Sequence, residues 1–211
     1  MKDQMRRAIV VTADGEATVA PDLALVSLAV SGQGKELAPT RDDVVLRSSA
    51  VLGALRELEI AEGDINAPDV SISPEYDYRR GQKLIGYRVA RPMTIKVRDL
   101  SRLGEVLDGV VTAGANEVQG AQMSASDPSA AEHQALVAAF AAAHAKAQAL
   151  ARAAKVALGA VIRVEEEDGG MAPMPRMRAM AAMADSAGAP TEVAAGDLTV
   201  TRRVRVWFAI D

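Results

Sequence analysis

The C-terminal stretch, residues 200–210, carries the clearest structural signal in the chain. Its apolar residues alternate with polar or outward-facing ones: Val200, Val204, Val206, Phe208 and Ile210 against Thr201, Arg203, Arg205 and Trp207. A period of two residues is that of a strand with one buried face. Similar stretches predict strands at residues 8–19, 23–30, 70–78, 87–98, 117–125 and 160–164. We expect Pro92 to lie in an edge strand or at a bulge, because proline cannot donate to a ladder.

Three stretches with helical periodicity lie between these strands. The first is 41–59, where Thr40 and Asp43 have the spacing of a capping box, and the second is 100–113. The third follows Asp127-Pro128 and runs to about residue 156. In it we expect one buried stripe, formed by Leu136, Phe140, Ala143, Ala147, Leu150 and Ala154. The fold class predicted is α+β, a largely antiparallel sheet with helices packed on one face.

The 211 residues fit a single domain, 1–211. The order strand, helix, strand, strand occurs twice, in 23–98 and in 116–210, so the chain has two candidate βαββ sub-units, 8–98 and 116–211. The second contains an insertion, 169–196, that is rich in Gly and Pro. A long loop without a core of its own is typically functional or disordered, and we expect this one to be flexible.

Composition excludes several classes of function. The chain has no cysteine, which removes disulfides, thiolate nucleophiles and zinc ribbons. Its two histidines, His133 and His144, lie eleven residues apart in one expected helix, about 16 Å along the axis, so they cannot share a metal ion. Aromatic residues make up 3% and the net charge is −4, which disfavours a nucleic-acid partner. No apolar run is long enough to span a membrane.

Catalytic motifs are equally scarce. Gly32-Gln33-Gly34 starts like a dinucleotide-binding loop, but Leu37 stands where the third glycine belongs, so we interpret it as a strand end. Several carboxylates could pair as acid and base: Asp14, Glu16, Asp22, Asp64, Asp69, Glu75 and Asp77. Any chain with 28 acidic residues offers such pairs, so solvated surface is the simpler interpretation. We therefore expect no catalytic, cofactor-binding or metal-binding residues, and keep a carboxylate-based enzyme of unknown substrate as an alternative.

The insertion holds the one compositional anomaly. Five methionines recur at every third position: Met171, Met174, Met177, Met180 and Met183. Thioethers are soft ligands that can hold Cu(I), and exposed methionine reacts with oxidants, so a metal or oxidant-handling loop is a second alternative. Methionine also adapts to irregular apolar surfaces, which favours a loop that packs against a neighbouring copy.

The pattern along the chain resembles the SIMPL-domain family, which includes the YggE-like and Brucella periplasmic immunogenic proteins. The resemblance rests on short segments in a specific order: Pro21-Asp22, Asp64-Ile65, Tyr76-Asp77-Tyr78, Gly86-Tyr87, Ala113-Gly114-Ala115-Asn116, Ala145-Lys146-Ala147, Leu158-Gly159, Pro190 and Gly196. It covers nearly the full chain.

This resemblance implies an α+β fold, export to the periplasm and a role in stress tolerance, often oxidative, with no known reaction. We expect a non-enzymatic soluble protein that acts through self-assembly or partner binding, its export signal removed from the chain given. Expected structural roles are a positive φ at Gly114, backbone hydrogen bonds from Asn116 and a core that contains Tyr76, Tyr78 and Tyr87.

Overall fold

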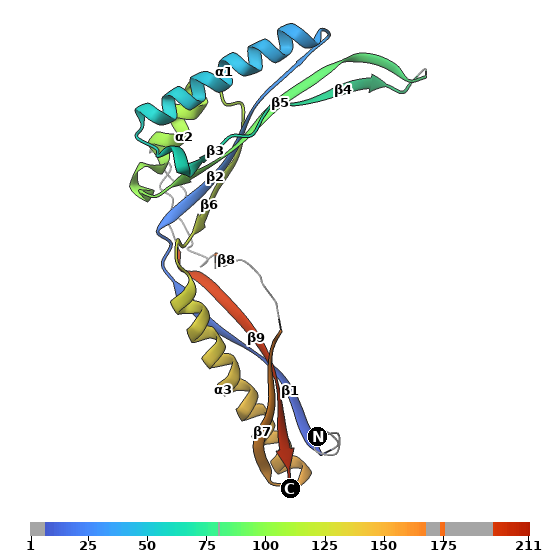
Figure 1. The fold of residues 1–211 in the computed structure, drawn as a ribbon, viewed down its shortest axis with the longest axis vertical. Coiled ribbons are helices and arrows are strands. Elements are labelled where there is room, and N and C mark those ends of the chain that lie inside the picture. The colour runs from blue at the N-terminus through green and yellow to red at the C-terminus, as the bar shows by residue number, and fades with distance from the viewer. Residues whose placement is uncertain (1–6, 80, 168–173, 176–195) are drawn as a thin grey trace, which may run out of the picture. The chain divides into compact units, whose positions relative to one another are not determined.

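The structure is a computed structural model that describes residues 7–79, 81–167, 174–175 and 196–211 (Figure 1). These residues form two compact units. Unit 1 contains the described residues up to Pro21, from Ala125 to Pro175 and from Gly196 onward. Unit 2 contains those of Asp22–Ser124. Part of the predicted insertion, 169–173 and 176–195, lies outside the described residues, and its expected flexibility stays a prediction.

Unit 1 is an antiparallel sheet with one long helix on one face. Its elements are β1 (Ala8–Val19), α3 (Ser129–Ala154), β7 (Leu158–Glu167), β8 (Met174–Pro175) and β9 (Leu198–Ile210). The central strand is β9, which pairs with β1 over its full length and with β7 and β8 on its other side. The C-terminal strand predicted from alternation is therefore confirmed, and its apolar positions Val204, Val206 and Phe208 face α3 in the core.

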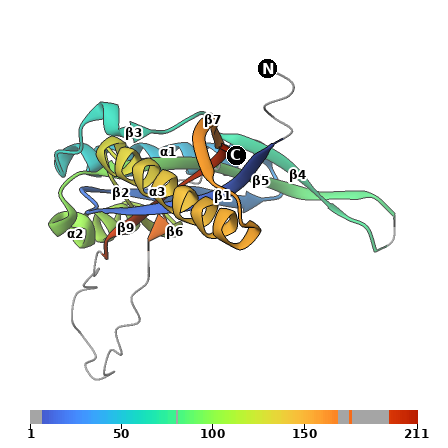
Figure 2. The same cartoon turned by 90° about the horizontal axis from the view of Figure 1, so that it is seen from below.

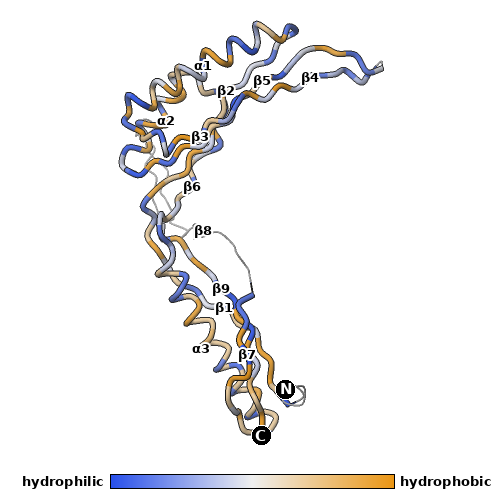
Figure 3. Tube along the Cα trace, viewed as in Figure 1, coloured by the Kyte–Doolittle hydropathy of each residue, from blue (hydrophilic) through white to orange (hydrophobic). Residues whose placement is uncertain are grey.

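Alanines form the buried stripe of α3. They occupy every fourth position: Ala131, Ala135, Ala139, Ala143, Ala147 and Ala151. Each step of four residues turns about 40° beyond a full turn, so the stripe winds around the helix and follows the twist of the sheet. In Figure 3 much of α3 has the pale orange of alanine. The predicted stripe was right for Ala143 and Ala147, which are fully buried, and wrong for Phe140 and Leu150, which are 37% and 51% exposed.

The reason why alanines are buried and larger side chains are exposed lies in β1. A Cβ atom on Gly15 would stand 2.1 Å from the amide nitrogen of Ala139 and 2.2 Å from the carbonyl oxygen of Ala135. The helix backbone therefore rests directly on the strand, and only alanine fits between them. Larger side chains must turn outward.

Charged pairs cover the other face of this sheet. Asp14 of β1 accepts hydrogen bonds from Arg203 of β9 at 2.6 and 3.2 Å. The Arg163 guanidinium lies 5.2 Å from the ring centroid of Trp207. Ion pairs join neighbouring strands on this face, which is typical of a solvated sheet surface.

Unit 2 is a second antiparallel sheet. Its strands are β2 (Leu23–Gly34), β3 (Ile65–Asn66), β4 (Ser71–Asp77), β5 (Lys83–Val97) and β6 (Glu117–Ser124), and its helices are α1 (Leu37–Glu57), η2 (Glu62–Asp64), η3 (Leu100–Arg102) and α2 (Leu103–Thr112). The sheet order is β3-β5-β2-β6, with β4 also paired to β5. Helix α1 packs on β2 and β5, and α2 packs against α1. Together the two units confirm the α+β class.

The capping box predicted for α1 was wrong. The helix begins at Leu37, four residues earlier than expected, and Glu36 is the cap residue. The Thr40 hydroxyl donates to the Glu36 carbonyl oxygen at 2.7 Å, a bond one turn back that threonine makes inside helices. Asp43 accepts from Arg47 instead.

Pro92 is not in an edge strand, since β5 pairs on both sides. On the outer side, however, β4 ends its pairing at Ala90 and β3 begins at Thr94, so Pro92 stands opposite a gap. Residues 67–70 connect β3 to β4 across this gap. Arg91 donates to the carbonyl oxygens of Pro68 and Ala67 at 2.9 and 3.2 Å, so these two acceptors have a hydrogen-bond partner.

The two units share one pairing order. In unit 1, β1 precedes the helix α3 and pairs with β9, and β9 pairs on its other side with β7. In unit 2, β2 precedes the helix α1 and pairs with β5, and β5 pairs on its other side with β4. The units are not the contiguous stretches 8–98 and 116–211, because β1 pairs with β9 and β6 pairs with β2. Internal duplication stays a prediction, which the shared order supports.

Candidate interaction surfaces

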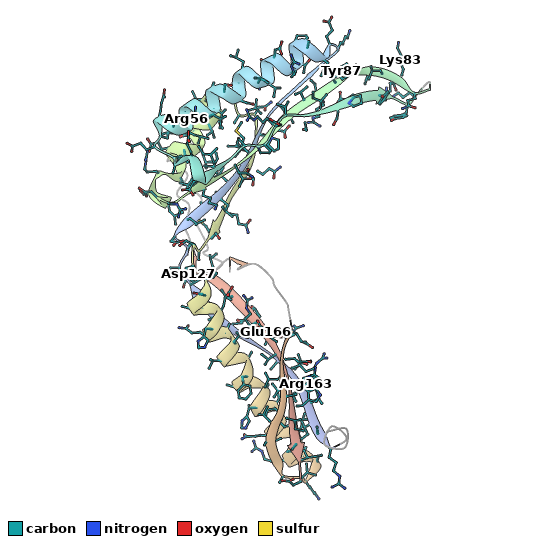
Figure 4. All side chains as sticks on the ribbon, in the orientation of Figure 1. Arg56, Lys83, Tyr87, Asp127, Arg163 and Glu166 are labelled. Carbon is teal, nitrogen blue, oxygen red and sulfur yellow. The ribbon has the colours of Figure 1, made fainter. Side chains whose placement is uncertain are left out.

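A two-stranded arm extends from the sheet of unit 2. The pairing of β5 with β2 ends at the pair Gly34–Tyr87, and from there towards Lys83 β5 pairs only with β4. We call residues 71–79 and 81–90 the hairpin arm. Figure 1 shows it running past the N-terminal end of α1, and Figure 2 shows β4 and β5 projecting together. Figure 4 places Lys83 near its tip and Tyr87 near its base. The strands predicted at 70–78 and 87–98 are confirmed, and they pair as the two sides of this hairpin.

One face of the arm is apolar. Gly32 and Gly34 face Val44 and Thr40 of α1, and their partners in β5 are Val89 and Tyr87. The register carries this same face outward along the arm, through the pairs Ile72–Val89, Pro74–Tyr87 and Tyr76–Leu84. This face is covered as far as the buried Val89. Beyond it, towards the tip, the same face continues but no described helix covers it.

Two of the three tyrosines predicted in the core, Tyr76 and Tyr78, are instead part of this exposed surface, while Tyr87 is half-buried. Tyr78 is 71% exposed and Tyr76 is 37% exposed, and their ring centroids lie 6.3 Å apart. Ile72, Leu84 and Ile85 are also exposed. Clustered exposed apolar side chains mark interaction sites, so the arm is the first candidate surface.

The arm ends in a basic turn. The Asp77 carboxylate accepts a hydrogen bond from the Arg79 amide at 2.9 Å, which closes the turn, and Gly81 has φ +98°. Among the described residues, no ion pair involves the side chains of Arg79 or Lys83. The tip thus presents cations next to exposed tyrosine.

A groove lies between α1 and α2 near their C-terminal ends. Its lining residues are Ala54, Glu57, Leu58, Asp108, Gly109, Thr112 and Ala113, and its volume is about 420 Å³. A Cβ on Gly109 would lie 2.9 Å from a Leu58 methyl carbon, so glycine lets the two helices approach. The floor is made of small or apolar residues. Glu57 and Asp108 are exposed. We call this the α1–α2 groove.

A smaller hollow of about 190 Å³ lies near η2 and η3, lined by residues of both charges. Asp64, one of the candidate carboxylates, accepts two hydrogen bonds from Arg98 there at 2.7 and 2.8 Å. This hydrogen bonding holds the pKa of Asp64 below its ordinary value. An acid held ionised has no proton to give near neutral pH, so Asp64 is suited to fixing the end of β5 rather than to acid catalysis.

The other candidate carboxylates are dispersed. Asp14 pairs with Arg203, and the hydrogen bond from that arginine lowers the pKa of Asp14. Glu75 accepts from Gln33 at 2.8 Å, and Asp77 serves the turn. Within the described ranges, no three His, Asp or Glu side chains converge as a metal site would require. The methionine segment lies almost entirely outside those ranges, so the copper alternative stays a prediction.

Asn116 has the backbone role expected of it. Its side chain accepts from the Ser31 amide at 2.8 Å and donates to the Ser31 carbonyl at 2.9 Å, imitating a neighbouring strand at the end of β6. Gly114 has φ +121°, as predicted, and Arg47 donates to the Ser31 carbonyl at 2.8 Å. This network joins α1, β2 and β6. It is structural.

Comparison with known proteins decides the family. The model of the SIMPL family, described as a protein of unknown function (DUF541), matches residues 9–208. This chain belongs to the SIMPL family. The resemblance seen in the sequence is thus confirmed.

Two relatives illustrate how far the similarity extends. The chain is 33% identical to the 26 kDa periplasmic immunogenic protein of Brucella melitensis over 215 residues, which is 96% of this chain and 84% of that protein. It is 30% identical to the uncharacterised protein YggE of Escherichia coli K12 over 175 residues, 82% of this chain and 71% of YggE. Helices of the described residues are too short or too polar to cross a membrane.

Solved structures add little. The match to AtUAH in complex with (S)-hydroxyglycine has a TM-score of 0.29 at 15% identity, and it spans 52% of this chain and 31% of that protein's length. Similarity this low supports no inference about function.

Proposed function

We propose that this SIMPL protein is an exported, non-enzymatic protein that acts by binding further copies of itself. The observation that carries the proposal is the hairpin arm, whose apolar face continues past the helix that should cover it. Two-stranded hairpins are marginally stable in water by themselves. Burial of Tyr76 and Leu84 against a second protein would stabilise both the arm and the complex.

Chemistry at the described acidic residues favours binding over catalysis. Asp14 and Asp64 are both held ionised by arginine. Export is supported by the name of the Brucella relative, a periplasmic protein. The link to oxidative stress comes from the family resemblance alone and belongs to the same proposal.

Light scattering coupled to size-exclusion chromatography tests the self-association. The wild-type protein should exceed the monomer mass of 22.1 kDa, and its mass should rise with concentration. Tyr76→Ser with Leu84→Ser should shift the protein towards monomer, because both residues lie on the apolar face of the arm. The matched control is Leu150→Ser, a leucine of α3 in unit 1 that is 51% exposed against 43% for Leu84, and this variant should assemble normally. A wild-type monomer over a hundredfold concentration range would refute the proposal.

A deletion strain of the natural host tests the role in cells. The strain should lose survival under peroxide and regain it with the wild-type gene. Complementation with the Tyr76→Ser, Leu84→Ser variant should fail at equal protein level. If that variant protects fully, self-association is not how the protein acts. Fractionation of the same cells reports export.

A further inference from the structure

The tip of the hairpin arm and the α1–α2 groove have opposite chemistry. In the sequence, residues 77–84 hold three basic residues against one carboxylate, a formal charge of +2, and the structure describes two of the three, Arg79 and Lys83. Tyr78 stands among them with 71% of its surface exposed. Such a tip combines an aromatic anchor with cations, the residue types enriched at interface hot spots.

The groove end of unit 2 is acidic. Residues 56–62 and 102–112 hold five carboxylates against two arginines, a formal charge of −3. Both arginines have partners there, since Arg56 lies 3.7 Å from Glu62 and Arg102 donates to Glu105 at 2.9 Å. Glu57 and Asp108, by contrast, have no ion pair among the described residues. The groove rim therefore offers free carboxylates above a floor of Ala54, Leu58 and Gly109.

One molecule cannot bring the tip into its own groove. Helix α1 has 21 residues, which makes it about 31 Å long. The arm leaves the sheet at the N-terminal end of α1, and the groove lies at the opposite end. Figure 4 shows this separation within unit 2, with Lys83 near the tip and Arg56 at the other end of the helix. Any contact between tip and groove must join two molecules.

We propose that the arm tip of one copy docks in the α1–α2 groove of the next. Tyr78 enters between the helices, and Arg79 and Lys83 meet Glu57 and Asp108 on the rim. The groove volume of about 420 Å³ lies within the roughly 300–1,000 Å³ of sites that bury small ligands, so it has room for a phenol ring. This inference rests on the proposed self-association and names its interface.

The proposed contact is head-to-tail. Each copy gives a tip to one neighbour and a groove to another, so the contact uses two different surfaces. Heterologous contacts of this kind close into a ring or continue as a filament, whereas an isologous pair stops at a dimer. Assemblies larger than a dimer are therefore expected.

Charge reversal with complementary mixing tests the contact. A tip variant carries Arg79→Glu and Lys83→Glu, and a groove variant carries Glu57→Lys and Asp108→Lys. Each alone places like charges opposite one another and should raise the dissociation constant at least about 100-fold, leaving a 22.1 kDa monomer. An equimolar mixture restores opposite charges at every contact and should assemble as the wild type does.

Matched controls separate this effect from net charge. Lys35→Glu with Arg7→Glu changes the charge as the tip variant does, and Glu36→Lys with Asp69→Lys matches the groove variant. These four residues are exposed, and both controls should assemble normally. Circular dichroism checks that each variant folds. The milder variant, Arg79→Gln with Lys83→Gln, should weaken assembly by less than the charge-reversed tip variant does.

The outcomes distinguish this inference from the function it rests on. If the wild type assembles and both reversed variants assemble equally well, the tip and groove are not the interface, although self-association stands. If both variants are monomers and their mixture stays monomeric, the two surfaces do not meet each other, and the inference is again wrong. A monomeric wild type overturns the inference and the proposed function together.

Discussion

Replacing Gly15 by alanine is expected to loosen unit 1. The added Cβ would stand 2.1 Å from the Ala139 nitrogen and 2.2 Å from the Ala135 oxygen. Ordinary contacts of a Cβ begin at about 3.4 Å, so α3 would have to move by more than 1 Å. Both atoms are helix backbone, which cannot rotate away as a side chain can.

The cost follows from what that movement undoes. Overpacking a core costs about 1–3 kcal/mol, and we expect the upper end because the alanine stripe and Phe208 lose close contact with α3 together. With a urea dependence of about 1–1.5 kcal/mol per molar for a unit of this size, a loss of about 3 kcal/mol lowers the unfolding midpoint by about 2–3 M. Trp207 is the only tryptophan and lies in β9, so its fluorescence reports on unit 1.

Gly53 supplies the matched control. It lies inside α1, and a Cβ there would meet nothing within 4 Å. Gly53→Ala should therefore stabilise unit 2 by roughly 0.5–1 kcal/mol, the difference in helix propensity. If Gly15→Ala unfolds at the wild-type urea concentration, α3 does not rest on β1 as closely as described, and the explanation of the alanine stripe fails with it.

Three further predictions concern stability, each measured by urea unfolding. Ala143→Leu should cost about 2–3 kcal/mol, since it overfills the buried stripe. Asn116→Ala should cost about 1–3 kcal/mol, because it leaves the backbone groups of Ser31 without their partners; a loss below 0.5 kcal/mol would contradict this. Asp64→Asn should be less stable than the wild type at pH 7. Because the pKa of Asp64 is lowered by Arg98, the ion pair stabilises the fold above pH 3.8, and the deficit of the variant should shrink as the pH falls through and below that value.

Periodicity predicted the element types well, and it failed where packing partners decide the burial. Alternation identified β9, and the Asp127-Pro128 signal located the start of α3. The stripe of α3 was right for Ala143 and Ala147 but wrong for Phe140 and Leu150, because the burial of this helix depends on Gly15, more than a hundred residues away. A helix without that glycine opposite would bury Phe140 and Leu150, as hydrophobicity alone suggests.

The candidate surfaces were only partly visible in the sequence. The two strands of the arm were predicted, yet Tyr76 and Tyr78 were expected in the core, since alternation shows which face is apolar and not whether anything covers it. The α1–α2 groove was missed because Leu58 and Gly109 come from helices fifty residues apart. The one sequence signal for it is the excess of acidic residues near both helix ends.

Element lengths explain why unit 2 has an arm and the described part of unit 1 has none. In unit 1, β9 has 13 residues and α3 has 26, about 43 Å of strand against about 39 Å of helix. In unit 2, β5 has 15 residues and α1 has 21, about 50 Å against about 31 Å. The same pairing order therefore gives a covered sheet in one unit and an overhang of nearly 20 Å in the other. Because the overhang keeps its apolar face, the shorter helix of unit 2 creates a surface that a second molecule can bury.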